Sequence, residues 1–179
     1  MIKDYFKKEE EALLLDLRKK IYRAIHRFPG LHFRGLQRKI KLGTGNLDYH
    51  LNYLEKISLI KIEKSKGNKR FYPQGLNDYE RNILGILRQK NFRKIIVKLL
   101  KEKDITHKGI IDYLHISPSS VTWYLGQLID RNILVLAEKE RKKYYQLKNK
   151  EEIIKVLVTY RESFVDKVVD SFVEAFEKQ

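Results

Sequence analysis

The sequence predicts a mainly α fold with small β wings, in which one helix–helix–hairpin unit occurs twice. Three observations lead to this prediction: an amphipathic segment at residues 44–57, a basic hairpin pattern directly after it, and the return of the same apolar pattern 74 residues later. Apolar residues spaced three to four positions apart indicate helices, and strict alternation of apolar and polar residues indicates strands.

The amphipathic segment TGNLDYHLNYLEKI, residues 44–57, is predicted to be a helix suited to lie against DNA. Leu47, Leu51 and Leu54 fall on one face of a 3.6-residue period. The opposite face is polar and aromatic, is expected to contain no acid, and comprises Gly45, Asn46, Tyr49, Asn52, Tyr53 and Lys56. The Thr44 hydroxyl is expected to cap the first turn. An ordinary amphipathic helix with a solvated face has the same pattern.

The segment that follows the helix reads as a basic hairpin. Residues 59–64 alternate as a half-buried strand does, residues 66–69 have turn chemistry, and residues 70–72 begin a return strand that Pro73 closes. A short helix at 34–40 and a tight turn at 41–43 precede the amphipathic segment. This order predicts a helix-turn-helix with a wing, in which the second helix enters the major groove and the wing lies along phosphates or the minor groove.

The same apolar pattern returns after 74 residues without a gap. The shift places Ile21 on Ile95, Leu36 on Ile110, and Leu51 on Leu125. A repeat of this length indicates a duplicated domain rather than a solenoid unit. The predicted fold is therefore two tandem winged helix-turn-helix domains plus a long C-terminal helix.

Three segments follow from this pattern. Residues 1–75 form the first winged domain with a leading helix at 4–28, and residues 76–148 form the second. In the second domain Ser117 is expected to cap a recognition helix that begins with Pro118. The outward residues expected there are Ser119, Ser120, Trp123, Gly126 and Gln127, with Arg141 and Lys142 at the tip of the wing.

Residues 149–179 are predicted to form one amphipathic helix with a wide apolar stripe. The stripe must be buried, either in a dimer interface or against the protein's own helix at residues 10–28. The residues expected to carry dimerisation are Leu157, Phe164, Val168 and Phe172.

Composition and net charge indicate the class of partner that the protein binds. The 179 residues carry a net charge of +15, which indicates a polyanionic partner, and 42% are hydrophobic, which is enough for packed cores. Residues 31–75 hold ten Lys and Arg against three Asp and Glu, a net charge of +7, whereas residues 105–147 carry +2 and residues 148–179 carry −1. A generally solvated basic surface is the alternative explanation of the excess.

Other kinds of chemistry find little support. There is no cysteine, and therefore no disulfide or thiolate zinc site, which fits a cytoplasmic protein. No signal peptide or membrane-spanning apolar run is evident. The five histidines lack metal-site spacing, His50 is expected to be a packed structural residue, and no phosphate-binding glycine motif occurs. We therefore expect no catalytic residues, no metal, no cofactor and no enzyme activity.

The stretch LGTGNLDYHLNYLEKISLIKIEKSKGNKRFY, residues 42–72, resembles an ArsR/MarR-type winged helix. Over residues 18–147 the chain resembles archaeal transcriptional regulators with two winged helix-turn-helix domains. The resemblance implies major-groove contacts by Thr44, Asn46, Tyr49, Asn52 and Tyr53. Ser58 stands where such domains usually have Gly. Trp123 and Asp130 are unusual in a groove-reading helix, so base reading is expected mainly from the first domain.

The sequence thus predicts a sequence-specific DNA-binding transcriptional regulator that binds double-stranded DNA as a homodimer, with the basal transcription machinery as a further partner. The expected phosphate contacts are Arg34, Arg38, Lys39, Lys56, Lys66, Lys69 and Arg70. Two alternatives stay open: a plasmid or viral replication initiator, and a protein–protein adaptor built from tandem winged helices.

Overall fold

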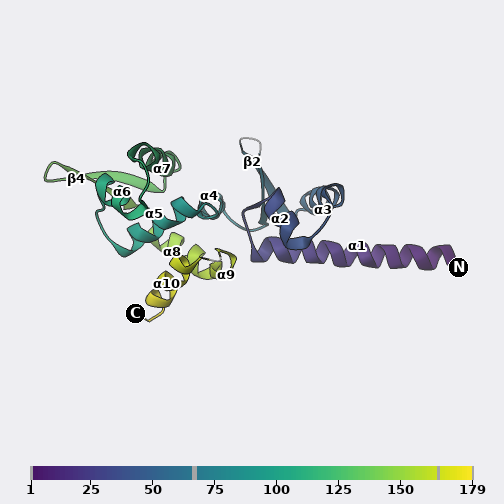
Figure 1. The fold of residues 1–179 in the computed structure, drawn as a ribbon. Coiled ribbons are helices and arrows are strands. Elements are labelled where there is room, and N and C mark those ends of the chain that lie inside the picture. Colours follow the sequence, from purple (N-terminus) through teal and green to yellow (C-terminus); the bar gives the residue numbers. More distant parts are fainter. Residues whose placement is uncertain (1, 66–67, 165, 179) are drawn as a thin grey trace. The chain divides into compact units, whose positions relative to one another are not determined.

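The computed structural model describes residues 2–65, 68–164 and 166–178, and the chain divides into two compact units, Met1–Asn77 and Asp78–Gln179 (Figure 1). The first unit consists of helices α1 (Ile2–Arg27), α2 (Phe33–Ile40) and α3 (Thr44–Lys56) with strands β1 (Leu31–His32), β2 (Ile60–Ser65) and β3 (Asn68–Pro73). The predicted helices and hairpin of this unit are confirmed. The additional strand β1 pairs with β3, so the sheet has the order β1-β3-β2.

One core holds the first unit together. Its fully buried members come from every larger element and are Ile21, Ile25, Leu36, Ile40, Leu47, Leu51, Leu54, Ile60 and Phe71. The helical residues recur at intervals of three or four, so one face of each helix turns inward. Burial of these side chains, worth about 1.5–3 kcal/mol each, fixes α3 against α1 and α2.

The turn between α2 and α3 has left-handed backbone. Lys41 has a φ of 60°, and its N–H donates to the Gln37 carbonyl. At the other end of α2, His32 is the N-cap, and its Nδ1 accepts from the Gly35 N–H at 2.9 Å. A Cβ on Gly35 would lie 2.8 Å from that nitrogen, so this position requires glycine.

The second unit repeats this order and adds helices at both ends. It consists of α4 (Asp78–Leu87), α5 (Lys90–Lys101), α6 (His107–Leu114), α7 (Pro118–Asp130), β4 (Leu134–Lys139), β5 (Lys142–Leu147), α8 (Lys150–Thr159), α9 (Arg161–Phe164) and α10 (Lys167–Phe176). The bounds of α6, α7, β4 and β5 are those of α2, α3, β2 and β3 shifted by 74. The left-handed residues His115 and Asn132 likewise correspond to Lys41 and Ser58. The two units therefore share the bounds of these helices and strands and the backbone conformation of these turns, as the predicted ungapped repeat requires.

The single long C-terminal helix predicted by the sequence is wrong. The chain turns after Tyr160, which ends α8, and again at Asp166, whose Oδ1 caps α10 by accepting from the Val168 N–H at 3.0 Å. Asp is a strong N-cap residue, because its carboxylate satisfies an N–H that the helix itself leaves unpaired. Three short helices result.

The apolar stripe of this segment is used inside the second unit. Leu157 is fully buried, Phe164 and Phe172 are 6% exposed, and Val168 is partly exposed. Helix α8 packs on α4 and α10 packs on α5. Leu157, Phe164 and Phe172 are therefore covered within one chain, and the assignment of Leu157, Phe164, Val168 and Phe172 to a dimer interface stays a prediction.

Within the described ranges, no helix combines the length and apolar character needed to cross a membrane. In the same part of the chain, no three His, Asp or Glu side chains gather as metal ligands would.

Candidate nucleic-acid interface

Helix α3 presents the predicted polar face outward. Leu47 and Leu51 are fully buried and Leu54 is 2% exposed, whereas Tyr49 is 58% exposed. The remaining exposed residues of this surface are Gly45, Asn46, Asn52 and Lys56. Side chains that face away from the core without being needed for packing are available to a partner.

Thr44 has a different role from the one predicted. Gly43 is the N-cap of α3 and makes no side-chain capping bond, so Thr44 is the first helical residue. Its Oγ1 accepts from Gln37 Nε2 at 3.1 Å, and the same nitrogen donates to the Leu42 carbonyl at 3.0 Å. The Thr44 hydroxyl therefore ties α3 to α2.

Tyr53 lies at the edge of the surface that faces α1. The Arg18 guanidinium stands 3.8 Å from the centre of its ring, a cation–π contact. The Tyr53 side chain is 37% exposed, and Tyr49, four residues earlier, stands freer of its neighbours. Tyr49 is therefore the more accessible of the two aromatic residues.

The acid Asp48 lies at the edge of this surface. Asp48 Oδ1 is 3.1 Å from Lys69 Nζ, and Asp48 Oδ2 accepts from Asn52 Nδ2 at 3.1 Å. The i, i+4 spacing of Asp48 and Asn52 is the signal that could have indicated this contact. The structure thus adds an acid at the edge of a face that was expected to contain none.

The predicted basic wing is only partly free. Lys66 lies outside the described residues. Lys69 is engaged by Asp48, and Arg70 is partly buried, with its Nη1 donating to the Gly30 carbonyl at 2.7 Å. Arg70 sits on the strand opposite Glu63 and His32 rather than at the tip. The structure therefore gives Arg70 a role in holding the turn at Gly30.

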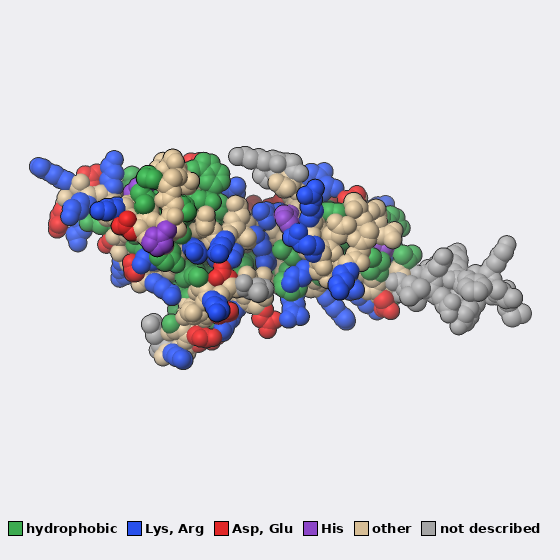
Figure 2. Space-filling model, in the orientation of Figure 1, with side chains coloured by type: hydrophobic (Ala, Val, Ile, Leu, Met, Phe, Trp, Pro, Cys, Tyr) green, Lys and Arg blue, Asp and Glu red, His purple; other side chains and the backbone are tan. Residues whose placement is uncertain are grey.

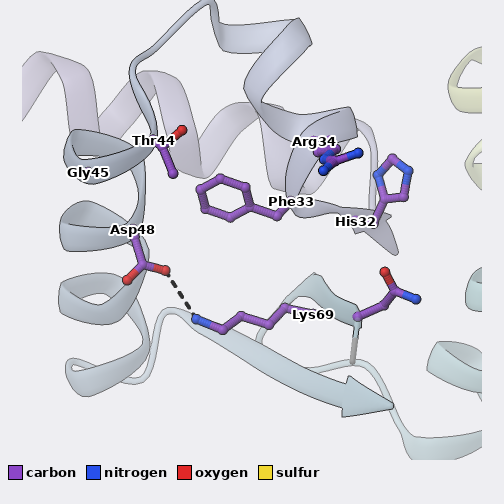
Figure 3. Close-up of a pocket in the computed structure, with 8 residues that line it drawn as sticks. His32, Phe33, Arg34, Thr44, Gly45, Asp48 and Lys69 are labelled. Atoms are coloured by element: carbon purple, nitrogen blue, oxygen red, sulfur yellow. Dashed lines mark hydrogen bonds and ion pairs between the residues drawn. The ribbon is translucent and has the colours of Figure 1, made fainter. Parts of the chain in front are cut away.

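A groove separates the start of α2, the start of α3 and the β3 strand (Figure 3). The Phe33 ring lies in it, with Arg34 and His32 on one side and Thr44 and Asp48 on the other. The groove has a volume of about 820 Å³ and is lined by His32, Phe33, Arg34, Thr44, Gly45, Asp48, Asn68 and Lys69. Arg34 is exposed and therefore brings positive charge to its rim.

Further positive charge lies on α2, where Arg38 and Lys39 are exposed. Lys39 Nζ is 4.3 Å from the centre of the Phe28 ring, which orients the ammonium group. On the face drawn in Figure 2, Lys and Arg side chains outnumber Asp and Glu in each unit. This agrees with the net charge of +15.

His50 is a packed residue, as predicted. It is 2% exposed, and among the described residues its Nδ1 has no hydrogen-bond partner. Burial lowers the pKa of His50 below 6.5, and the nearby Arg18 charge lowers it further. The imidazole is therefore kept neutral beneath the outward face of α3.

Helix α7 of the second unit presents an aromatic surface. Trp123 is 55% exposed, and its ring centre lies 5.9 Å from Phe92 and 5.1 Å from Tyr124. Tyr124 OH accepts from Asn91 Nδ2 at 3.0 Å. These contacts fix the base of the indole while leaving its outer face accessible.

The other predicted residues of the second unit are more dispersed. Ser117 caps α7 as expected, and its Oγ contacts the hydroxyls of Ser119 and Ser120 at 3.1 and 2.8 Å. Gln127 is partly exposed. Arg141 and Lys142 are exposed at the hairpin tip, where Arg141 has a left-handed φ of 62°.

Comparison with known proteins adds to this geometry. Residues 15–84 match the family model HTH_HVO_0163_N, an N-terminal HTH domain. The first unit contains a helix-turn-helix domain. Over 111 residues the chain is 32% identical to MJ1398 of Methanocaldococcus jannaschii, described as an uncharacterized HTH-type transcriptional regulator. The match covers 62% of this chain and 24% of that relative, so the chain spans about a quarter of the relative's length.

Proposed function

We propose that this protein is a sequence-specific DNA-binding transcriptional regulator with two tandem winged helix-turn-helix domains, of which the first reads most of the sequence. The observation that carries the proposal is the orientation of α3, which buries Leu47, Leu51 and Leu54 and turns Asn46, Tyr49 and Asn52 outward. Amide and hydroxyl groups on an exposed helix are suited to the donor and acceptor pattern of the major groove. The match of residues 15–84 to an HTH domain supports this assignment.

Charge supports DNA as the partner. Residues 31–75 carry +7, and Arg34, Arg38, Lys39 and Lys56 are exposed around α2 and α3. Lysine and arginine side chains that neutralise phosphates release counterions, which supplies sequence-independent affinity. These four residues are the proposed phosphate contacts, with Tyr49 and Asn52 as the principal base contacts.

The second unit is assigned a supporting role. Its residues 105–147 carry only +2, and Trp123 occupies the position that Tyr49 holds in the first unit. Exposed Trp is typical of interface anchors, because one residue supplies a large apolar surface and a polar N–H. We assign Trp123 to packing on DNA or on a protein of the transcription machinery, and Arg141 and Lys142 to phosphate contact.

Homodimer formation remains part of the proposal, since two copies would place their recognition helices on half-sites about 34 Å apart. The interface is left unassigned, because Leu157, Phe164 and Phe172 are buried within one chain. Light scattering on the full chain tests the dimer directly. A monomer at working concentration contradicts it.

An electrophoretic shift with random duplex DNA at low salt tests the central proposal, followed by selection of bound sequences from a random pool. A regulator enriches one consensus, and a palindrome or direct repeat in it defines the symmetry of the complex. Absence of any shift would favour the protein–protein adaptor. A matched control is the Tyr49→Ala, Asn52→Ala double variant, which should still shift random DNA but should enrich no consensus.

A further inference from the structure

Asp48 lies at the edge of the proposed DNA-binding face and uses both of its carboxylate oxygens. Oδ1 is 3.1 Å from Lys69 Nζ on the hairpin, and Oδ2 accepts from Asn52 Nδ2 at 3.1 Å on the next turn of α3. Asp48 thus holds both the Lys69 ammonium group and the Asn52 amide, which would otherwise be free to contact DNA (Figure 3 shows the contact with Lys69).

Stability does not explain this arrangement. The Lys69 and Asp48 side chains are 37% and 43% exposed, and exposed ion pairs contribute little to folding because water screens them. A carboxylate on a surface that approaches phosphates also repels the partner. We therefore look for the role of Asp48 in the recognition of DNA and not in the stability of the fold.

The second unit shows that the fold does not need the network. A shift of 74 places Thr122, Gly126 and Lys143 on Asp48, Asn52 and Lys69, a set without a carboxylate or an amide. Thr122 instead donates from Oγ1 to the Pro118 carbonyl at 3.0 Å and lies 2.9 Å from His107 Nε2. The element bounds are nevertheless the same, so the network belongs to the first unit's task and not to its architecture.

We infer that Asp48 is the positioning residue that sets the base preference of the first unit, an inference that rests on the proposed DNA binding. Asn has two N–H donors and one carbonyl acceptor, and the contact with Asp48 uses one donor. The oxygen and the second N–H remain to pair with an adenine edge in the major groove. By holding Lys69, Asp48 also removes a phosphate contact that would strengthen binding to every sequence equally.

Binding measured against salt concentration tests the part that concerns Lys69. The Asp48→Asn variant should release Lys69 and make the slope of log K against log salt steeper by about 0.9, and Asp48→Asn with Lys69→Gln should return it to the wild-type value. Glu151→Gln is the matched control, because it removes an exposed acid at the start of α8, outside the proposed DNA-binding helices, and changes the net charge equally. Its slope should stay at the wild-type value.

A double-mutant cycle tests the part that concerns Asn52. The probe is the duplex that the wild-type protein enriches, with single A·T to G·C changes. Asp48→Ala and Asn52→Ala should each reduce discrimination at the same base pair by about tenfold, and the double variant should lose no more than Asn52→Ala alone.

The outcomes separate this inference from the proposed function. If the wild-type protein discriminates but Asp48→Asn and Asp48→Ala keep its slope and preference, the inference is wrong and DNA binding stands. A fall in unfolding temperature without a change in base preference assigns Asp48 a structural role and also overturns the inference. If the wild-type protein binds no duplex, the proposed function itself fails.

Discussion

Arg93 donates from Nε and Nη2 to one oxygen of Asp166, Oδ2, at 2.9 and 2.5 Å. The pair joins α5, which precedes α6 and α7, to α10, which follows the second hairpin. The two side chains are 9% and 12% exposed, and Arg93 Nη1 also donates to the Leu87 carbonyl at 2.6 Å. A nearly buried ion pair of this kind penalises any change that removes only one partner.

The first prediction concerns the charge of Asp166. Asp166→Asn keeps a good N-cap for α10 but leaves Arg93 uncompensated, so we expect a loss of about 3–5 kcal/mol in the free energy of unfolding. Urea denaturation measures this loss. Asp170→Asn is the matched control, since its partner Arg161 is more exposed, and it should cost less than about 1 kcal/mol. Equal losses in both variants would contradict the assigned role.

The second prediction concerns acid. Burial acts to raise the pKa of Asp166, but the Val168 N–H and the Arg93 guanidinium outweigh it and hold that pKa below the usual 3.8. The unfolded chain therefore binds the proton first on acidification. The stability from this group is present above about pH 4 and is lost as the pH falls through the folded-state pKa. Urea denaturation between about pH 2 and 6 should show that the free energy of unfolding falls less with decreasing pH for Asp166→Asn than for the wild type.

The third prediction separates Arg70 from the phosphate contacts. Arg70→Ala leaves the buried Gly30 carbonyl without its donor, so we expect a loss of about 1–3 kcal/mol in the free energy of unfolding. The salt slope of DNA binding should not change. Lys64→Ala, an exposed residue on the neighbouring strand, should leave stability within about 0.5 kcal/mol. If Arg70→Ala instead flattens the slope of log K against log salt, Arg70 does contact a DNA phosphate and the prediction is wrong.

The fourth prediction concerns the rim of the groove. Arg34 is exposed at the start of α2, so Arg34→Ala should flatten the salt slope by about 0.9 and weaken binding to all sequences alike. Lys108, which is also exposed, occupies the equivalent position of the second unit. Lys108→Ala should change the slope less, and the reverse order would assign the main electrostatic contact to the second unit.

The fifth prediction assigns specificity between the units. Tyr49→Ala and Asn52→Ala should each cost about 1–3 kcal/mol in discrimination for each base pair that the variant no longer reads. Trp123→Ala should leave preference nearly intact and reduce total affinity or assembly. Binding of each variant to the enriched duplex and to a scrambled duplex is the measurement. If only Trp123→Ala removes the preference, the two units have been assigned in the wrong order.

Local patterns in the sequence were sufficient for the repeated helices and hairpins. Leu47, Leu51 and Leu54 mark the inward face of α3, where His50 is also buried, and apolar spacing survives duplication even where identities do not. The same reasoning failed at the C-terminus. Its apolar stripe continues through Tyr160 and Asp166, so periodicity alone predicts one helix, while the break depends on the cap and on the partner Arg93, which is 73 residues away.

The site was predictable in outline but not in detail. Exposure of Tyr49 and Asn52 follows from helix geometry. The engagement of Lys69 by Asp48 and of Arg70 by the Gly30 carbonyl depends on tertiary packing, because the fold brings residues 21 and 40 positions apart into contact. A basic residue near a turn is therefore not by itself evidence of a free charge.

The Arg93–Asp166 pair also determines where this chain can be cut. A domain boundary directly after the second hairpin is the simplest choice, because β5 ends at Leu147. Without residues 149–179, the second unit would expose the apolar faces of α4 and α5 to water and would leave the Arg93 charge without its partner. We expect such a fragment to aggregate and to be cleaved readily by proteases. The C-terminal helices are thus part of the fold of the second unit. A lower molecular mass in solution after such a truncation would therefore not by itself identify a dimer interface.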